Sequence, residues 1–184
     1  MNAFFIVNRG PARQKFFFRK GVDNFVLMVY NTYRKRGKEM VREINFDMDG
    51  TLANLYGVKG WLSMLETADE TPYKVAEPLI NMQSLARVLN RLQNEGWKLN
   101  VISWLAKNST AEYDERVTKA KELWLAHHLR SVKWDKVAIV PHGTPKSTCG
   151  HGILFDDEKG NREEWNGIAF DETEILKVLK NLGK

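Results

Sequence analysis

Cysteine and long apolar runs are almost absent from this chain of 184 residues. With Cys149 as its single cysteine, the chain can form neither a disulfide framework nor a cysteine-rich zinc module. A reducing compartment is the simplest environment for such a protein, and we expect it to be cytoplasmic. The best apolar run, residues 25–30, is far shorter than the roughly 20 residues that cross a bilayer, so we expect no membrane partner.

The remaining composition is that of one ordinary globular domain. Hydrophobic residues make up 43% of the chain and charged residues 28%, which excludes a collagen-like, low-complexity or disordered chain. The length suffices for a single hydrophobic core, and a division into two full domains would be strained.

Positive charge is concentrated in the first forty residues. This segment has nine basic and two acidic residues, a balance of +7, whereas the whole chain has a net charge of +5. Binding of nucleic acid through charge would therefore depend on residues 1–40 alone. The segment is either a basic arm that contacts phosphate backbones or a solvated extension without a partner, and its only candidate element is residues 25–30, a strand or short helix.

The end of this basic N-terminal extension is compatible with a second translation start. Gly37, Lys38 and Glu39 can be encoded by a purine-rich run that is typical of a bacterial ribosome-binding site, and Met40 follows immediately. The native start is therefore Met1 or Met40, and in the second case residues 1–39 are not native. The organised pattern begins at residue 41, and we expect the main domain to span residues 41–184.

Apolar runs alternate with amphipathic segments from residue 41 onward. The helical spacing is clearest over residues 82–94, which end at Gly96, a residue that commonly terminates helices. Strands are predicted at residues 43–46, 99–102, 137–140, 152–155 and 167–170, and further helices at 111–129 and 172–182. This alternation predicts an α/β fold, a doubly wound, Rossmann-like parallel sheet covered on both faces. Residues 54–80 are expected to form a small helical cap insert, with a short helix at 61–65.

Polar residues gather where the predicted strands end. In parallel sheets of this kind, ligands bind outside the carboxyl ends of the strands. The residues at these ends are Asp47 and Asp49 after the first strand, Ser103 after the second, Lys146 before the fourth, and Asp156 with Asp157 after it. The sequence therefore places its candidate site at this edge of the sheet.

One motif among these residues is specific. Asp47-Met48-Asp49-Gly50-Thr51, preceded by an apolar strand, resembles the first signature of the haloacid dehalogenase-like (HAD) superfamily of phosphotransferases, D-x-D-G-T. Four required residues in this order are rare by chance, although Asp and Gly also favour ordinary surface turns. The resemblance extends over most of residues 41–184.

The resemblance implies a chemical role for each residue of the motif. Asp47 would be the nucleophile that forms an aspartyl-phosphate, and Asp49 would protonate the leaving oxygen and then activate water. Gly50 lets the chain turn sharply and Thr51 caps the next segment, both beside the substrate. Because a phosphate monoester is doubly anionic, attack by a carboxylate requires a divalent cation, here expected to be Mg²⁺.

The later residues resemble the remaining superfamily motifs. Ser103 matches the hydroxyl that binds the transferring phosphoryl group, and Lys146 matches the lysine that neutralises phosphate and nucleophile; their ordinary alternatives are a strand-end serine and a surface lysine. Asp156 and Asp157 match the acidic pair that binds the metal. Two adjacent buried carboxylates would be unfavourable without a cation. We expect Asp157 to bind Mg²⁺ directly with Asp156 in support, together with Asp47 and the carbonyl of Asp49.

Within the superfamily, the chain is most similar to the 5′(3′)-deoxyribonucleotidase-like group. The residues that carry this similarity are the Asp47 motif, Lys121-x-x-Trp124-Leu-x-x-His127, Lys146-Ser147, and Asp156-Asp157 with Asn161. The group usually has a substantial helical cap, whereas this chain offers about thirty residues for one. Trp61, Tyr73 and Trp104 are the candidates for contact with the substrate; Trp61 and Tyr73 either stack on a base or pack the cap on the core.

These features together predict a Mg²⁺-dependent phosphomonoester hydrolase, with nucleoside monophosphates as the preferred substrate. The alternatives are a phosphatase of another small metabolite, one that acts on polynucleotide ends through residues 1–40, and a non-catalytic phosphate-binding module. His142 and His151 flank Lys146 and are either exposed loop residues or neighbours of the leaving group. Cys149 lies in a Ser-Thr-Cys-Gly loop without a recognisable protein-tyrosine-phosphatase signature.

Overall fold

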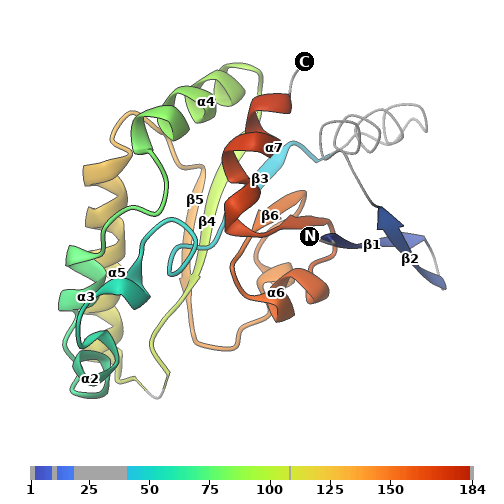
Figure 1. Cartoon of the computed structure of the whole chain (residues 1–184). Helices are drawn as coiled ribbons and strands as arrows, with labels where there is room; N and C mark the ends of the chain where they lie inside the picture. Colours follow the sequence, from blue (N-terminus) through green and yellow to red (C-terminus); the bar gives the residue numbers. More distant parts are fainter. Residues whose placement is uncertain (1–2, 10–11, 19–40, 108, 183–184) are drawn as a thin grey trace.

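The structure is a computed structural model that describes residues 3–9, 12–18, 41–107 and 109–182 (Figure 1). Strands β1 (Ala3–Arg9) and β2 (Ala12–Phe18) pair as an antiparallel hairpin, which was not predicted from the sequence. The strand or helix expected at residues 25–30, the basic residues 34–38 and Met40 lie outside the described residues.

The centre of the molecule is a parallel sheet of five strands in the order β5-β4-β3-β6-β7. The strands are β3 (Glu43–Phe46), β4 (Lys98–Trp104), β5 (Lys136–Val140), β6 (Ile153–Phe155) and β7 (Ile168–Phe170). The predicted strands and the doubly wound α/β fold are confirmed. The chain runs outward from β3 through β4 to β5 and then returns to β6 and β7, so the strand order reverses beside β3, where ligands bind in such folds.

Three helices cover one face of the sheet. They are α4 (Met82–Asn94), α5 (Ala111–His128) and α7 (Ile175–Asn181), with α4 and α7 side by side (Figure 1). Because successive strand residues point to opposite faces, Ile44 and Phe46 face these helices and pack in one core with Leu89 and Val178. Helix α4 starts where predicted because the Asn81 side chain accepts a hydrogen bond from the Ser84 N–H.

Shorter elements and a long connection cover the opposite face. Here Trp165 packs against Ile102 and Leu154, with Cys149 at the edge of the cluster. The connection from β5 to β6 contains the 3₁₀ turn η2 (Lys146–Thr148), and α6 (Lys159–Glu164) follows β6; neither was predicted. The predicted closing helix is divided into a 3₁₀ turn, η3 (Glu172–Glu174), and α7.

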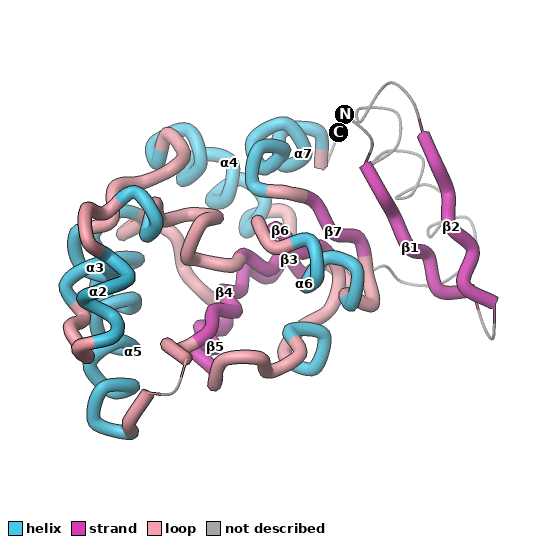
Figure 2. The backbone as a smooth tube through the Cα atoms, turned by 60° about the horizontal axis from the view of Figure 1, so that its bottom comes forward, coloured by secondary structure: helices cyan, strands magenta, loops and turns pink. Residues whose placement is uncertain are grey.

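The segment predicted as a cap contains η1 (Leu55–Gly57), α2 (Trp61–Glu66) and α3 (Thr71–Val75). Figure 2 shows α2 and α3 beside α5. Leu55 and Tyr73 pack against Tyr113, Val117 and Ala120 of α5 in a small cluster separate from the main core. The segment is therefore attached to the body through α5 and, at Val58, Ala76 and Ile80, through the main core.

A buried amide pair ties the sheet to the connection that contains Lys146. The Asn45 side chain donates to the carbonyl oxygens of His151 (2.5 Å) and Ile153 (3.1 Å) and accepts from the Asn100 amide at 3.0 Å. Gly150 lies so close that an added Cβ would be 2.4 Å from the Asn45 side-chain oxygen. Lys146 is thus in a segment that is anchored to β3 a few residues further along.

We expect Gly150→Ala to lower the free energy of unfolding by about 1–3 kcal/mol, because the methyl group would displace the Asn45 amide. Gly160→Ala in α6 is the matched control: its Cβ would meet nothing within 4 Å, and alanine favours a helix over glycine. Urea unfolding of both variants measures the effect. Equal stabilities of the two variants would contradict the close packing at Gly150.

Candidate active site

The carboxyl ends of β3 and β6 bring together the acids and the lysine that the sequence singled out. Asp47 follows β3, and Asp156 and Asp157 follow β6. The Lys146 ammonium donates to Asp47 Oδ1 and to Asp156 Oδ2, each at 2.6 Å. All but Asp157 are buried, so the ion pairs are shielded from solvent.

A tight turn after β3 determines where the acids point. The carbonyl oxygen of Met48 accepts hydrogen bonds from the N–H groups of Thr51, Leu52 and Ala53 at 3.3, 2.9 and 2.8 Å. Gly50 has a φ angle of 79°, in the left-handed region. An added Cβ there would lie 2.5 Å from Asp157 Oδ2, so only glycine fits this turn without displacing the acid.

Thr51 holds two of the acids relative to each other. Its hydroxyl lies 3.1 Å from Asp157 Oδ1 and 3.4 Å from Asp47 Oδ2, and it accepts from the Asp157 N–H at 3.1 Å. Gly50 and Thr51 were predicted to contact substrate, but neither lines the cavity over these acids. In this structure they shape the turn and orient the carboxylates.

The two adjacent acids have different surroundings. Asp156 is fully buried and accepts, besides Lys146, the Asn161 side-chain amide (3.1 and 3.2 Å) and the Glu158 N–H at 2.9 Å. Asp157 is only half-buried, and its carboxylate accepts from Thr51. The arrangement therefore engages the Asp156 oxygens more fully than those of Asp157.

Three carboxylates are close enough to share a metal ion. Asp47, Asp156 and Asp157 each offer an oxygen, and these oxygens lie within 4.8 Å of one another. This trio, two members of which are buried, could hold a metal ion. A donor set made only of carboxylate oxygens suits hard divalent cations such as Mg²⁺, Ca²⁺ or Mn²⁺. Participation of the Asp49 carbonyl stays a prediction.

The pKa values of Asp156 and Asp157 reflect burial and crowded negative charge. Burial, with repulsion from Asp47 and Asp156, raises the pKa of Asp157 to about 7. Burial and Asp47 also raise the pKa of Asp156 to about 6, although Lys146 opposes the shift. For Lys146, burial disfavours the charge, but Asp47 and Asp156 outweigh it and raise its pKa. The carboxylates therefore need more positive charge than Lys146 provides.

Asp49, the second acid of the motif, forms an ion pair with a different lysine, Lys121. Its Oδ2 accepts from the Lys121 ammonium at 2.5 Å, and Lys121 also donates to Ser103 Oγ at 2.8 Å. Burial raises the pKa of Asp49, and Lys121 opposes that shift. Ser103 is fully buried and does not line the cavity, so its predicted contact with a phosphoryl group stays a prediction. Lys121 was noted in the sequence only as part of a helix pattern.

A cavity of about 430 Å³ lies over these groups. Asp47, Asp49 and Lys146 contribute to its wall, with Glu66, Glu158 and Lys107. Its aromatic residues are Tyr56, Trp61, Tyr73, Trp104 and His142. The cavity is thus polar where the acids lie and aromatic around them.

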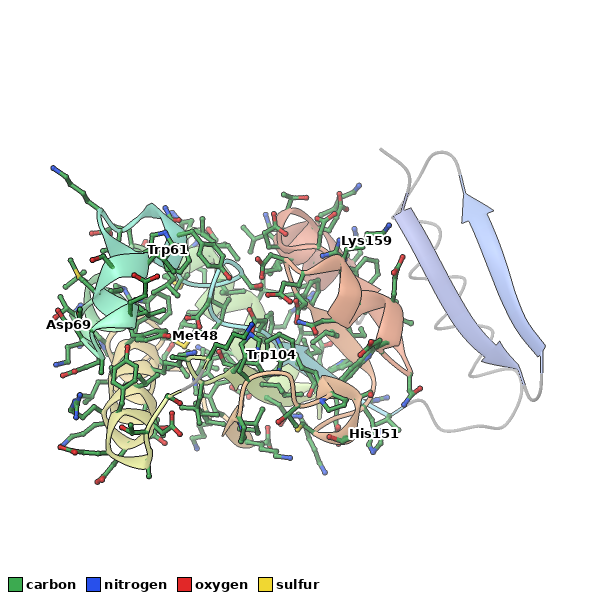
Figure 3. The ribbon with its side chains drawn as sticks, turned by 90° about the horizontal axis from the view of Figure 1, so that it is seen from below. Met48, Trp61, Asp69, Trp104, His151 and Lys159 are labelled. Carbon is green, nitrogen blue, oxygen red and sulfur yellow. The ribbon has the colours of Figure 1, made fainter. Side chains whose placement is uncertain are left out.

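The predicted contacts Trp61, Tyr73 and Trp104 all line this cavity, in different ways. Trp61 is partly exposed and meets Tyr56 edge to face at 5.1 Å, whereas Tyr73 is 3% exposed and packs in the α5 cluster. In Figure 3, Trp61 lies on α2 across the view from Lys159, with Trp104 between them. The Lys146 ammonium lies 5.1 Å from the centre of the Trp104 ring.

The two loop histidines, His142 and His151, have different positions relative to the cavity. The His142 ring lies 5.0 Å from the Trp104 ring and lines the cavity. His151 is exposed, lies outside the cavity lining, and donates its backbone N–H to Glu43. Tyr56 and His142 thus join the site, and the sequence offered no signal for Tyr56.

Comparison with protein-family models gives no match, and neither does comparison with curated proteins. Over the part of the chain that the structure describes, the helices are too short or too polar to cross a membrane.

We expect the metal-free protein to lose stability as the pH rises. The Asp157 carboxyl titrates near 3.8 when unfolded and near 7 when folded, so folding takes up a proton between these values. The stability that this group contributes is complete below the lower value and lost as the pH passes the upper one. Urea unfolding in a chelator from about pH 4 to about pH 8 measures the decline, which should be smaller in Asp157→Asn.

Mg²⁺ should reverse the decline at the upper end of this range in the wild-type protein, because binding to the ionised carboxylates stabilises the folded state. Asp157→Asn should gain much less. The same pH dependence in both proteins, with no response to the metal, would contradict the shared site.

Proposed function

We propose that this protein is a Mg²⁺-dependent phosphomonoester hydrolase that acts in the cytoplasm through an aspartyl-phosphate. The observation that carries the proposal is the double ion pair of Lys146 with Asp47 and Asp156, in which Lys146 and Asp47 line a cavity, beside the three-carboxylate cluster. The resemblance of residues 47–51 to the first HAD signature supports the same chemistry.

Charge balance supports the need for a divalent cation. Asp47, Asp49, Asp156 and Asp157 lie together with the two ammonium groups of Lys121 and Lys146. If all are ionised, the group has two negative charges in excess, which is unfavourable in a largely buried site. When bound, Mg²⁺ supplies this charge and lowers the repulsion between carboxylate and phosphate. Asp47, Asp156 and Asp157 would hold it.

In the first step, a carboxylate oxygen of Asp47 forms a bond to phosphorus while the bond from phosphorus to the ester oxygen breaks. Asp49 in its protonated form gives its proton to the departing oxygen, so that an alcohol leaves. Lys146 offsets the charge of nucleophile and phosphoryl group. Because Lys121 is the donor to Ser103 Oγ, the Ser103 hydroxyl proton can be donated to another acceptor.

In the second step, the Asp49 carboxylate takes a proton from a water molecule, which attacks phosphorus. The bond between phosphorus and Asp47 breaks, inorganic phosphate leaves, and both aspartates return to their starting forms. Asp49 therefore acts as acid and then as base, which suits a carboxyl group whose pKa is raised by burial.

The aromatic wall favours a nucleoside monophosphate as substrate. Trp61 and Tyr56 are partly exposed beside the acids, in a cavity of about 430 Å³. Aromatic rings stack on nucleic-acid bases with little dependence on which base is present. Another small phosphorylated metabolite remains the second candidate, because the acids and Lys146 recognise only the phosphate.

Asp47→Asn should lower kcat for 4-nitrophenyl phosphate in the presence of Mg²⁺ by at least about a thousandfold, because an amide cannot serve as the nucleophile. Glu122→Gln, a change at an exposed position on α5, is the matched control and should retain full activity. Circular dichroism checks that both variants fold. An Asp47→Asn protein with the wild-type rate would refute the assignment of Asp47 as the nucleophile.

Phosphate release from a panel of metabolites, with and without Mg²⁺, tests substrate and metal together. We expect nucleoside monophosphates to be hydrolysed best and only with the metal. Trp61→Ala should then raise KM for a nucleoside monophosphate about tenfold, the loss of one stacking contact, and leave KM for ribose 5-phosphate unchanged. An equal effect on both substrates would show that Trp61 packs the insert instead of binding a base.

A further inference from the structure

Lys121 of α5 is fully buried, yet no step of the proposed reaction uses it directly. Its ammonium has three hydrogens and three acceptors: Asp49 Oδ2 at 2.5 Å, Ser103 Oγ at 2.8 Å and the carbonyl oxygen of Trp104 at 2.6 Å. It also lies 4.8 Å from the centre of the Tyr73 ring. A buried ammonium is strongly unfavourable unless it is paired in this way.

The partners of Lys121 come from separate parts of the fold. Asp49 is in the turn after β3, Ser103 and Trp104 end β4, and Tyr73 belongs to α3 of the insert. One ammonium therefore contacts the second acid of the motif, the end of the neighbouring strand and the insert. The position of the Asp49 carboxylate depends on this contact, because Lys121 is the one side-chain partner described for it.

The two buried lysines differ in what they can reach. Lys146 lines the cavity and contacts Asp47 and Asp156, so it can meet a phosphate group there. Lys121 does not line the cavity, whereas Asp49 does. Of the two side chains that accept hydrogen bonds from Lys121, Asp49 lines the cavity and Ser103 does not, so Lys121 influences a bound substrate chiefly through the Asp49 carboxylate.

We propose that Lys121 is a positioning residue that holds the Asp49 carboxylate in the cavity wall, where it exchanges a proton with the leaving oxygen. The inference rests on the proposed hydrolase activity. Each aspartate of the motif then has its own ammonium partner, Lys146 for Asp47 and Lys121 for Asp49. Without Lys121, the Asp49 side chain is free to turn away from the leaving oxygen while Asp47 still attacks.

The dependence of the rate on the leaving group tests this role. An acid matters most for a poor leaving group, so kcat/KM is measured with ribose 5-phosphate, phenyl phosphate and 4-nitrophenyl phosphate. This parameter covers the steps up to departure of the alcohol and excludes hydrolysis of the aspartyl-phosphate. We expect Lys121→Met to lower kcat/KM for ribose 5-phosphate about a hundredfold or more, the size of a general-acid contribution, and for 4-nitrophenyl phosphate less than about tenfold.

Asp49→Asn and the double variant complete the cycle. Asp49→Asn should show the same selective loss, and adding Lys121→Met to it should change kcat/KM less than about twofold, because the two residues act as a unit. Lys119→Met, an exposed change on the same helix, is the matched control and should behave as wild type. An equal loss for all three esters, or losses that multiply in the double variant, would overturn the proposal, since either result means that Lys121 acts independently of Asp49.

Two further measurements separate a folding defect of Lys121→Met, and failure of the proposed function, from failure of the positioning role. If Lys121→Met does not fold, Lys121→Gln is measured with the same esters; its shorter amide leaves Asp49 unsupported, and the same outcomes apply. Failure of the proposed function itself is visible separately, because the wild-type protein would then release no phosphate from any ester.

Discussion

The Lys146 ammonium binds Asp47 and Asp156 at 2.6 Å each and so joins positions that are 99 and 10 residues away from it in the chain. The rest of the site depends on this interaction, because it is the direct ionic link between the carboxylates of β3 and β6. It also leaves the site short of positive charge, as the raised pKa values of Asp156 and Asp157 indicate. The fold therefore carries a repulsion that a divalent cation would relieve, and stability and cation affinity at this edge of the sheet are linked.

Much of the fold could be predicted from the sequence because its signals are local. Helix α4 shows the apolar spacing of an amphipathic helix and a glycine just after its end, and its predicted bounds are confirmed. The parallel strands are short apolar runs followed by polar residues. Strands that are buried on both faces of a sheet show this pattern in the sequence, so they could be predicted. Helix α6 was missed because its six residues contain one buried side chain, that of Asn161, and show no periodicity.

The site could be predicted only in part, because some of its contacts join residues that are far apart in the sequence and leave no local signal. Asp47, Lys146 and Asp156 were found through motifs and strand ends, and the structure brings them together. The contact of Lys121 with Asp49 spans 72 residues, and the local sequence places Lys121 in a helix pattern without indicating its partner. Thr51 was expected beside the substrate, but which way a hydroxyl points in a tight turn depends on the neighbouring strand.

The paired amides of Asn45 and Asn100 bear on how the chain reaches its native alignment. A parallel sheet has no hairpin turn to set which residues lie opposite each other, so other contacts must do so. Asn45 and Asn100 are cross-strand partners in β3 and β4, and their side chains are hydrogen-bonded on the face of the sheet away from α4, α5 and α7. A slip by one position would turn one of these amides into the apolar core without a partner, which is strongly unfavourable. This pair thus fixes the register in which Asp47, the residue after β3, lies level with Ile102, next to Ser103 of β4, before any ligand is present.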